Sequence, residues 1–158
     1  MCIRDRHWPA RRAVLADVAA PTLYTRLLPP SVVPSRILDD LEHFAWDTPV
    51  VKIDYALSGK IPWRSENLGG AGTVHLGGDM NALARAGADL ETGRIPRDPF
   101  LLFGQMTTAD PTRSPAGTES AWSYSHLPRG VTDDEAAHEL AERMDAVLSA
   151  HLSLIHIS

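Results

Sequence analysis

The chain has 158 residues, a formal net charge of −5 and one cysteine, Cys2. This length accommodates one domain or a large part of one. The mildly acidic balance argues against a general nucleic-acid surface, which needs a face rich in Lys and Arg. One cysteine offers neither a disulfide framework nor a cysteine metal site. No apolar run approaches the length of about 20 residues that spans a bilayer, so the sequence does not support membrane association, and cytoplasmic is the default localisation.

The two ends of the chain are compatible with related coding DNA. Met1–Arg6 (MCIRDR) and Leu152–Ile157 (LSLIHI) can be encoded by inverted copies of one DNA sequence. Such a pair resembles the transposon end that sequencing libraries leave on both sides of an insert; the alternative is a natural start and stop. We treat the ends as a scar outside the fold. We therefore expect adapter-like tails at 1–6 and 152–158 that pack poorly, around a piece of a longer protein.

The N-terminal part predicts one strand and two short helices. Basic residues followed by a short apolar run indicate a brief strand that ends at Asp17. Pro21 suits the first turn of a helix, which ends before Pro29. A second helix is expected to begin with Ser35 as its N-cap. Its apolar residues recur at helical spacing and form the expected buried stripe: Ile37, Leu38 and Leu41.

Two further strands and a turn follow. Val50–Leu57 alternates apolar and charged residues, as in a half-exposed strand, and Thr73–Leu76 continues the extended pattern. Gly77 and Gly78 then break the strand, and Asp79 is expected to cap a helix. The glycine pair also invites a phosphate-loop interpretation, but it lacks both the GxGxxG and the Walker lysine patterns. A simple strand-to-helix turn is the favoured interpretation.

The stretch Phe100–Pro128 predicts a β-hairpin. In Ala121–Leu127 the aromatic residues occupy one face and the small residues the other, which is period-two alternation. Phe100–Thr108 is apolar on both faces at its start, as in a buried central strand. Between the arms, Asp-Pro and Ser-Pro pairs and Gly117 supply turn chemistry. Within this turn, Asp110 and Arg113 are more typical of a turn-stabilising pair than of a substrate clamp.

The C-terminal part predicts the longest helix. Thr132 and Glu135 have the spacing of a capping box, and apolar residues recur at helical spacing over Asp133–Ala150. Together these elements predict an α+β fold, an antiparallel sheet with packed helices and the long helix on one sheet face.

No catalytic motif is visible. There is no HExxH or similar metal-ligand spacing and no GxSxG elbow beside a serine, so the catalytic residues stay unknown and no metal is expected. Aromatic side chains with polar tips suit a mostly apolar cavity that orients its ligand with few hydrogen bonds. The alternative for each is an ordinary core position. The expected substrate-binding residues are Tyr55, Gln105, Trp122, Tyr124 and His126.

A family resemblance rests on three stretches: VVKIDYALSGKIPW, GTVHLGG and FGQMTTADPTRSPAGTESAWSYSHLPRG. Their combination resembles phytoene desaturase-like FAD-dependent oxidoreductases, in particular the bacterial branch similar to pyridine nucleotide-disulfide oxidoreductase domain-containing protein 2. The most specific part is DPTRSPAG followed by W-x-Y-x-H-x-P. The resemblance implies an amine oxidase-like architecture, in which one domain binds FAD and an inserted sheet-and-helix domain shapes an apolar substrate cavity.

On this resemblance, residues 7–19 are a remnant strand of the FAD-binding domain and 20–151 form the substrate-binding domain. Ala16 and Asp17 would then lie near the flavin nucleotide. The implied reaction oxidises a C–C or C–N bond of an apolar substrate by hydride transfer from carbon to FAD. The family's glycine-rich fingerprint and its closing FAD motif are absent from this sequence, so the missing FAD-binding domain of the same chain would bind most of the flavin. The alternative is a non-catalytic module that binds an apolar ligand or another protein.

Overall fold

The structure is a computed structural model that describes residues 9–153. The chain divides into two compact units, Met1–Trp46 and Asp47–Ser158. This break comes later in the chain than the boundary expected after residue 19. Most of the two expected tails, including Ile3 and Ile155, lies outside the described residues.

The first unit contains two short helices, as the sequence predicts. α1 (Ala20–Thr22) runs into a π-helical turn, Leu23–Leu27, and α2 spans Ser35–Glu42. The predicted buried stripe of α2 is wrong, because none of its residues is buried and Leu38 is 38% exposed. A helix of this length has too few neighbours here to cover its apolar side.

The strand predicted to end at Asp17 is also wrong for the described chain. Residues 13–17 pair with no other strand, and the side chains of Val14 and Leu15 are 78% and 96% exposed. A strand is defined by hydrogen bonds to a neighbour. Without one, the apolar run stays extended and unpaired.

The N-cap residues of three helices can be compared with those predicted from the sequence. Asp79 caps α3 (Met80–Glu91) as predicted, accepting a hydrogen bond from the Ala82 amide at 2.9 Å. The predicted caps Ser35 and Thr132 are each wrong by one residue. Pro34 is the N-cap of α2, and Asp133 caps α5 (Asp134–Ala150) by accepting from the Ala136 amide. The capping box with Glu135 therefore does not form.

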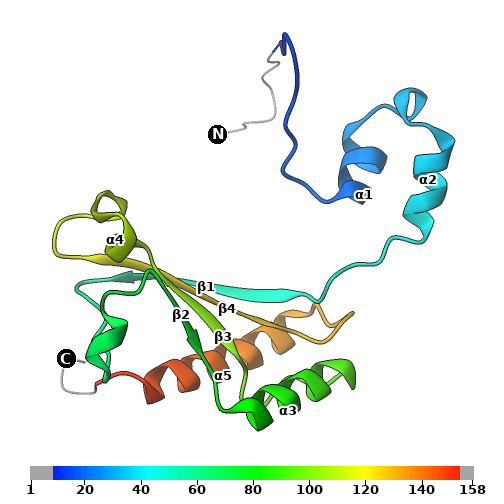
Figure 1. Cartoon of the computed structure of the whole chain (residues 1–158). Coiled ribbons are helices and arrows are strands. Elements are labelled where there is room, and N and C mark those ends of the chain that lie inside the picture. The colour runs from blue at the N-terminus through cyan, green and yellow to red at the C-terminus, as the bar shows by residue number, and fades with distance from the viewer. Residues whose placement is uncertain (1–8, 154–158) are drawn as a thin grey trace. The chain divides into compact units, whose positions relative to one another are not determined.

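The second unit is an α+β fold built on one antiparallel sheet. Its strands are β1 (Val50–Leu57), β2 (Thr73–Leu76), β3 (Leu101–Gln105) and β4 (Glu119–His126), in the spatial order β1-β4-β3-β2 (Figure 1). The β3–β4 hairpin and the central position of β3 confirm the prediction. β3 is shorter than predicted, because the helix α4 (Met106–Ala109) begins directly after Gln105.

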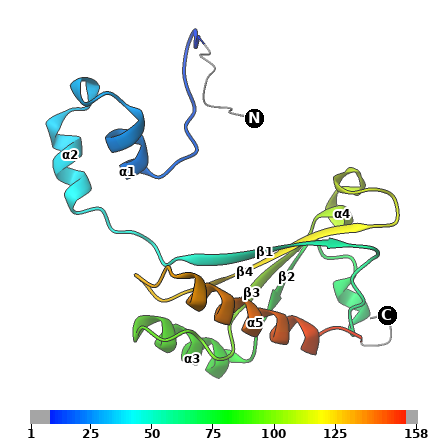
Figure 2. The same cartoon turned by 180° about the vertical axis from the view of Figure 1, so that it is seen from behind.

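The two faces of the sheet differ. Figure 2 shows α3 and α5 on the same side of the sheet. We call that side the covered face; it carries Leu101 and Phe103, which are at most 1% exposed. α5 buries Leu140 and Met144 completely among them, and burying a side chain of this size stabilises by about 1.5–3 kcal/mol. The other side, which we call the open face, carries Trp122 and its neighbours.

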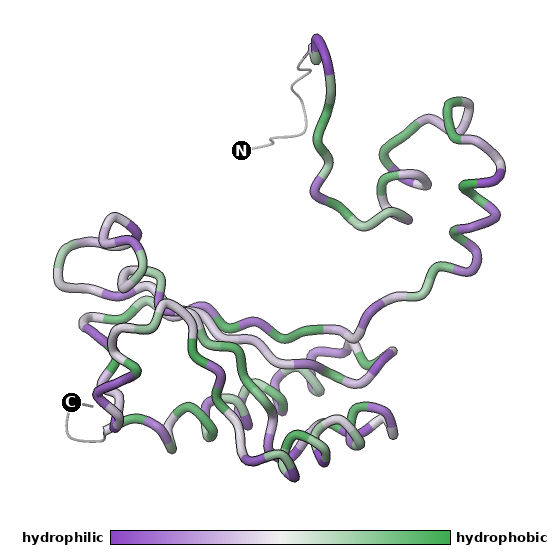
Figure 3. The backbone as a smooth tube through the Cα atoms, viewed as in Figure 1, coloured by the Kyte–Doolittle hydropathy of each residue, from purple (hydrophilic) through white to green (hydrophobic). Residues whose placement is uncertain are grey.

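The strand patterns follow from this asymmetry. Hydropathy alternates along β1 in Figure 3, and its residues alternate between exposed and half-buried. Along β4, buried residues alternate with partly exposed ones. Period-two alternation is what a sheet with one helix-covered face requires.

A buried amide fixes the loop between β1 and β2. Gln105 is 2% exposed, and its Nε2 donates to the carbonyl oxygens of Leu68 and Ala71 at 2.9 and 2.6 Å. Its Oε1 accepts from Trp63 Nε1 at 2.8 Å. One side chain therefore satisfies three polar groups of a loop, which would otherwise be unpaired in a dry environment.

The structured region extends past residue 151. Leu152 forms an isolated bridge with Trp63 and packs against the core, and the Ser153 amide donates to the Pro62 carbonyl at 2.7 Å. These two residues do not pack poorly, contrary to expectation, because the C-terminal end of α5 brings them beside the loop. Among the described helices, none is long and apolar enough to cross a bilayer.

Replacing Gln105 with Leu should destabilise the second unit. The change leaves two carbonyls and one indole N–H without their partner, and we expect a loss of about 3 kcal/mol in the free energy of unfolding. Urea denaturation followed by circular dichroism measures it. Thr73→Val, a near-isosteric change at an exposed position of β2, is the control; equal stability of the two variants would contradict the expectation.

Candidate functional site

The open face of the sheet is the candidate site. The register places two rows of residues across it. One row runs Asp54, Trp122, Gly104, Thr73 and the other runs Lys52, Tyr124, Leu102, His75. Directly opposite residues of antiparallel strands share a face. Figures 1 and 2 show α3 and α5 on the opposite side of the sheet, and α4 reaches the open face through Met106.

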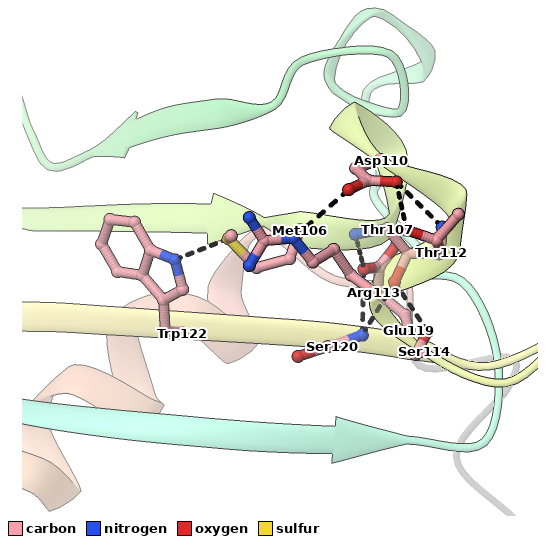
Figure 4. Close-up of polar contacts among 9 residues, drawn as sticks. All are labelled: Met106, Thr107, Asp110, Thr112, Arg113, Ser114, Glu119, Ser120 and Trp122. Carbon is pink, nitrogen blue, oxygen red and sulfur yellow. Dashed lines mark hydrogen bonds and ion pairs between the residues drawn. The ribbon is translucent and has the colours of Figure 1, made fainter.

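Trp122 lies flat over a glycine. A Cβ atom built on Gly104 would come within 2.3 Å of Trp122 Cε2 and 2.5 Å of its Nε1, so only glycine allows the indole this approach. Trp122 Nε1 also donates to Met106 Sδ at 3.0 Å, a contact that Figure 4 shows. The indole position is therefore fixed both by a missing side chain and by a polar contact.

The ring of Trp122 begins a row of rings along β4. Trp122 and Tyr124 stack with centroids 5.9 Å apart and an interplanar angle of 10°, and Tyr124 meets the His126 ring edge to face at 5.9 Å. His126 Nδ1 pairs with Thr48 Oγ1 at 3.2 Å. Residues two apart on a strand project from the same face. The result is a half-buried apolar strip with polar atoms at its edge.

Only three of the five expected substrate-binding residues share this face. Trp122, Tyr124 and His126 lie together, but Tyr55 and Gln105 each pair with Ala121 and so lie on the covered face. The expectation that all five line one cavity is wrong. The physical reason is register: each of these strands alternates correctly, but pairing sets which residues of different strands become neighbours.

Tyr55 is instead an anchor between β1 and α5. Its hydroxyl pairs with Ser123 Oγ and donates to Asp145 Oδ1, both at 3.1 Å. Burial raises the pKa of Tyr55 to about 12, and the neighbouring Asp145 carboxylate adds to the shift. Loss of solvent and a nearby negative charge both disfavour the phenolate.

The turn beside the site is held by carboxylates (Figure 4). The Asp110 carboxylate accepts hydrogen bonds from the Thr112 amide at 3.0 Å and from the Thr112 hydroxyl at 2.7 Å. The bond from the hydroxyl is the main cause of the lowered pKa of Asp110. Arg113 Nε reaches Asp110 Oδ2 at 3.4 Å. This geometry supports the turn-stabilising interpretation of the pair.

Sequence reasoning missed Glu119. This residue is only 4% exposed, and its Oε1 accepts from the amides of Thr107 and Ser120 at 2.8 and 3.0 Å. Because Thr107 lies in the first turn of α4, the carboxylate binds one amide that the helix itself leaves unpaired. The sequence did contain one signal: Glu119 lies an even number of residues from Ala121, so the alternation of β4 places both on the covered face.

The two expected flavin contacts lie in the first unit. Ala16 and Asp17 line a shallow concavity with Leu23 and Tyr24. No described residue of that unit forms a strand that leads into a helix through a glycine-rich turn. A dinucleotide pyrophosphate is bound by backbone amides at such a turn. The described part of this unit therefore does not fit the pyrophosphate of FAD.

The turn between β2 and α3 does not fit it either. The Asp79 carboxylate already accepts from the Ala82 amide, the main cause of its lowered pKa, so a negative charge occupies the helix N-terminus. A Cβ on Gly77 would lie 2.8 Å from the Phe100 ring, and one on Gly78 would lie 2.4 Å from the Ala82 side chain. Close packing explains these glycines.

Within residues 9–153, no group of three or more His, Cys, Asp or Glu residues gathers as metal ligands would. No protein-family model, no curated protein and no solved structure matches this chain.

Replacing Gly104 with Ala should displace Trp122. We expect a destabilisation of about 1–3 kcal/mol from overpacking, together with a red shift of tryptophan fluorescence as the indole loses its contact with Met106. Gly59→Ala is the matched control, since no atom lies within 4 Å of a Cβ at that position. An unchanged emission spectrum in the Gly104 variant would contradict the described position of the indole.

Tyr55 should make stability fall at high pH. Its folded pKa of about 12 exceeds the ordinary tyrosine value of 10.0, so its contribution to stability is complete below pH 10 and is lost as the pH rises towards 12. Tyrosinate absorbance should show a late titration that Tyr55→Phe removes. If the late titration persists in the Tyr55 variant, the assignment is wrong.

Proposed function

We propose that this chain forms the substrate-facing part of an FAD-dependent oxidoreductase of the phytoene desaturase and amine oxidase-like type. In this proposal the missing FAD-binding domain of the same chain binds most of the flavin. The observation that carries the proposal is the open face: a fixed strip of three rings on a sheet whose other side is closed by α5.

The chemistry of the strip favours an apolar ligand. Stacked indole and phenol rings offer a large apolar surface at little cost in side-chain freedom. The indole N–H is already committed to Met106 Sδ, whereas His126 and Thr48 place polar atoms at one end of the strip. An apolar substrate would lie along the rings and be oriented at the polar end.

Flavin, when bound, would supply the acceptor for the hydride. The residues described here include no turn that fits the pyrophosphate, so their proposed role is not to bind the flavin. They would instead position the substrate and exclude water. Ala16 and Asp17 remain the proposed contacts to the nucleotide from this chain. The extended, unpaired segment 13–17 accords with a strand that would pair within the FAD-binding domain.

The 158-residue chain purified with added FAD should not retain flavin through gel filtration, since residues 9–153 include no pyrophosphate-binding turn. The whole protein encoded by the continuous reading frame around this sequence should retain flavin and show its absorbance. A whole protein without flavin would overturn the proposed function. A short chain that holds FAD stoichiometrically would overturn the assignment of flavin binding to the missing domain.

Binding of an apolar dye to the open face is measured separately, on the same purified chain. The apolar dye Nile red should fluoresce on the chain, and Trp122→Ala should weaken its binding by about tenfold, as loss of one large aromatic contact does. Tyr55→Phe, on the covered face, is the matched control and should bind the dye as the wild type does. Equal weakening by both variants would exclude the open face as the ligand surface.

A further inference from the structure

β1 forms one edge of the sheet and presents unpaired backbone groups there. The Leu127 amide donates to the Pro49 carbonyl at 2.9 Å, so Pro49 and Leu127 form a hydrogen-bonded pair of the β1–β4 ladder. Hydrogen-bonded pairs occur at every second residue of an antiparallel ladder. The peptide groups of Val51, Ile53 and Tyr55 therefore face β4 as well. The peptide groups at even-numbered positions of β1 point outward, away from the sheet: Val50, Lys52, Asp54 and Ala56.

This edge is long and accessible. β1 has eight residues, and the side chains of Lys52 and Asp54 are 49% and 71% exposed. Within the described residues, no hydrogen bond involves the outward peptide groups of β1. Such an edge is a template for another strand.

We propose that β1 pairs antiparallel with β1 of a second copy of this chain. The outward phase permits only registers in which even-numbered residues face one another. In one of these, Lys52 lies opposite the partner's Asp54 and Asp54 lies opposite the partner's Lys52. Ile53 then meets the partner's Ile53 on the two-fold axis.

Charge selects this register from its neighbours. A shift of two residues in one direction sets Lys52 against the partner's Lys52. The same shift in the other direction sets Asp54 against the partner's Asp54. Like charges directly opposite one another destabilise a strand pair, whereas opposite charges stabilise it. The sequence Lys-Ile-Asp is thus self-complementary about its centre.

The same two side chains contact each other within one copy. Dimerisation would exchange this exposed pair, which contributes little, for two cross-strand pairs and a set of backbone hydrogen bonds. Two four-stranded sheets would become one continuous sheet. Since opposite residues share a face, both strips of Trp122, Tyr124 and His126 would lie on the same side of it.

Charge reversal tests the proposal on the full 158-residue chain. Lys52→Asp and Asp54→Lys each create two like-charge pairs in the dimer and should raise its dissociation constant by about tenfold or more. The double variant Lys52→Asp/Asp54→Lys restores opposite charges and should dimerise like the wild type. Analytical ultracentrifugation measures each constant, and circular dichroism establishes that each variant is folded.

Mixing the two single variants, Lys52→Asp and Asp54→Lys, is the most specific test of the proposed register. One copy carries two acidic residues and the other two basic residues, so both pairs become complementary only in the mixed dimer. Lys60→Asp changes the net charge as Lys52→Asp does but lies outside the paired strand, and it should leave dimerisation unchanged. A monomeric wild type, equal dimerisation by all variants, or no mixed dimer would each overturn the proposal. Equal association by all variants would indicate contact through the open face.

Discussion

The packing of α5 against one face of the sheet is the constraint on which the rest of this unit depends. Leu140 and Met144 are completely buried against Leu101 and Phe103, and the small residues of β4 allow the helix to approach. Once this face is closed, strand alternation sends every second side chain to the opposite side. The aromatic residues of β4 collect on the open face because the helix occupies the other one.

Buried polar side chains then determine where the loops lie. Gln105 ends β3 and binds the loop before β2, while Glu119 begins β4 and binds the first turn of α4. Because each has strong partners, neither leaves an orphaned polar atom in the core. Their common effect is at one end of the sheet, where they position Met106 beside Trp122. The open strip is therefore fixed from the covered side.

The sequence was informative where the pattern is local. β1 and β2 have the predicted bounds, and α5 begins one residue from its predicted start, because alternation and helical spacing are properties of one segment. Register is not local. Tyr55 and Gln105 fell on the covered face because their pairing with Ala121 sets their side, and no single-strand pattern contains that pairing. Residues 13–17 show the same limit, since an apolar run predicts a strand but not a partner.

The glycines of two regions have different structural effects, and this difference distinguishes the open face from the turn between β2 and α3 as a candidate site. In the Gly77-Gly78 turn the missing side chains admit Phe100 and Ala82, and the adjacent Asp79 holds the helix terminus where a phosphate would bind. At Gly104 the missing side chain admits an indole on the open face. The first arrangement repels an anion, and the second presents a flat apolar surface. In the described part of this unit, the features that glycine makes possible therefore favour contact with an apolar ligand over contact with a nucleotide phosphate.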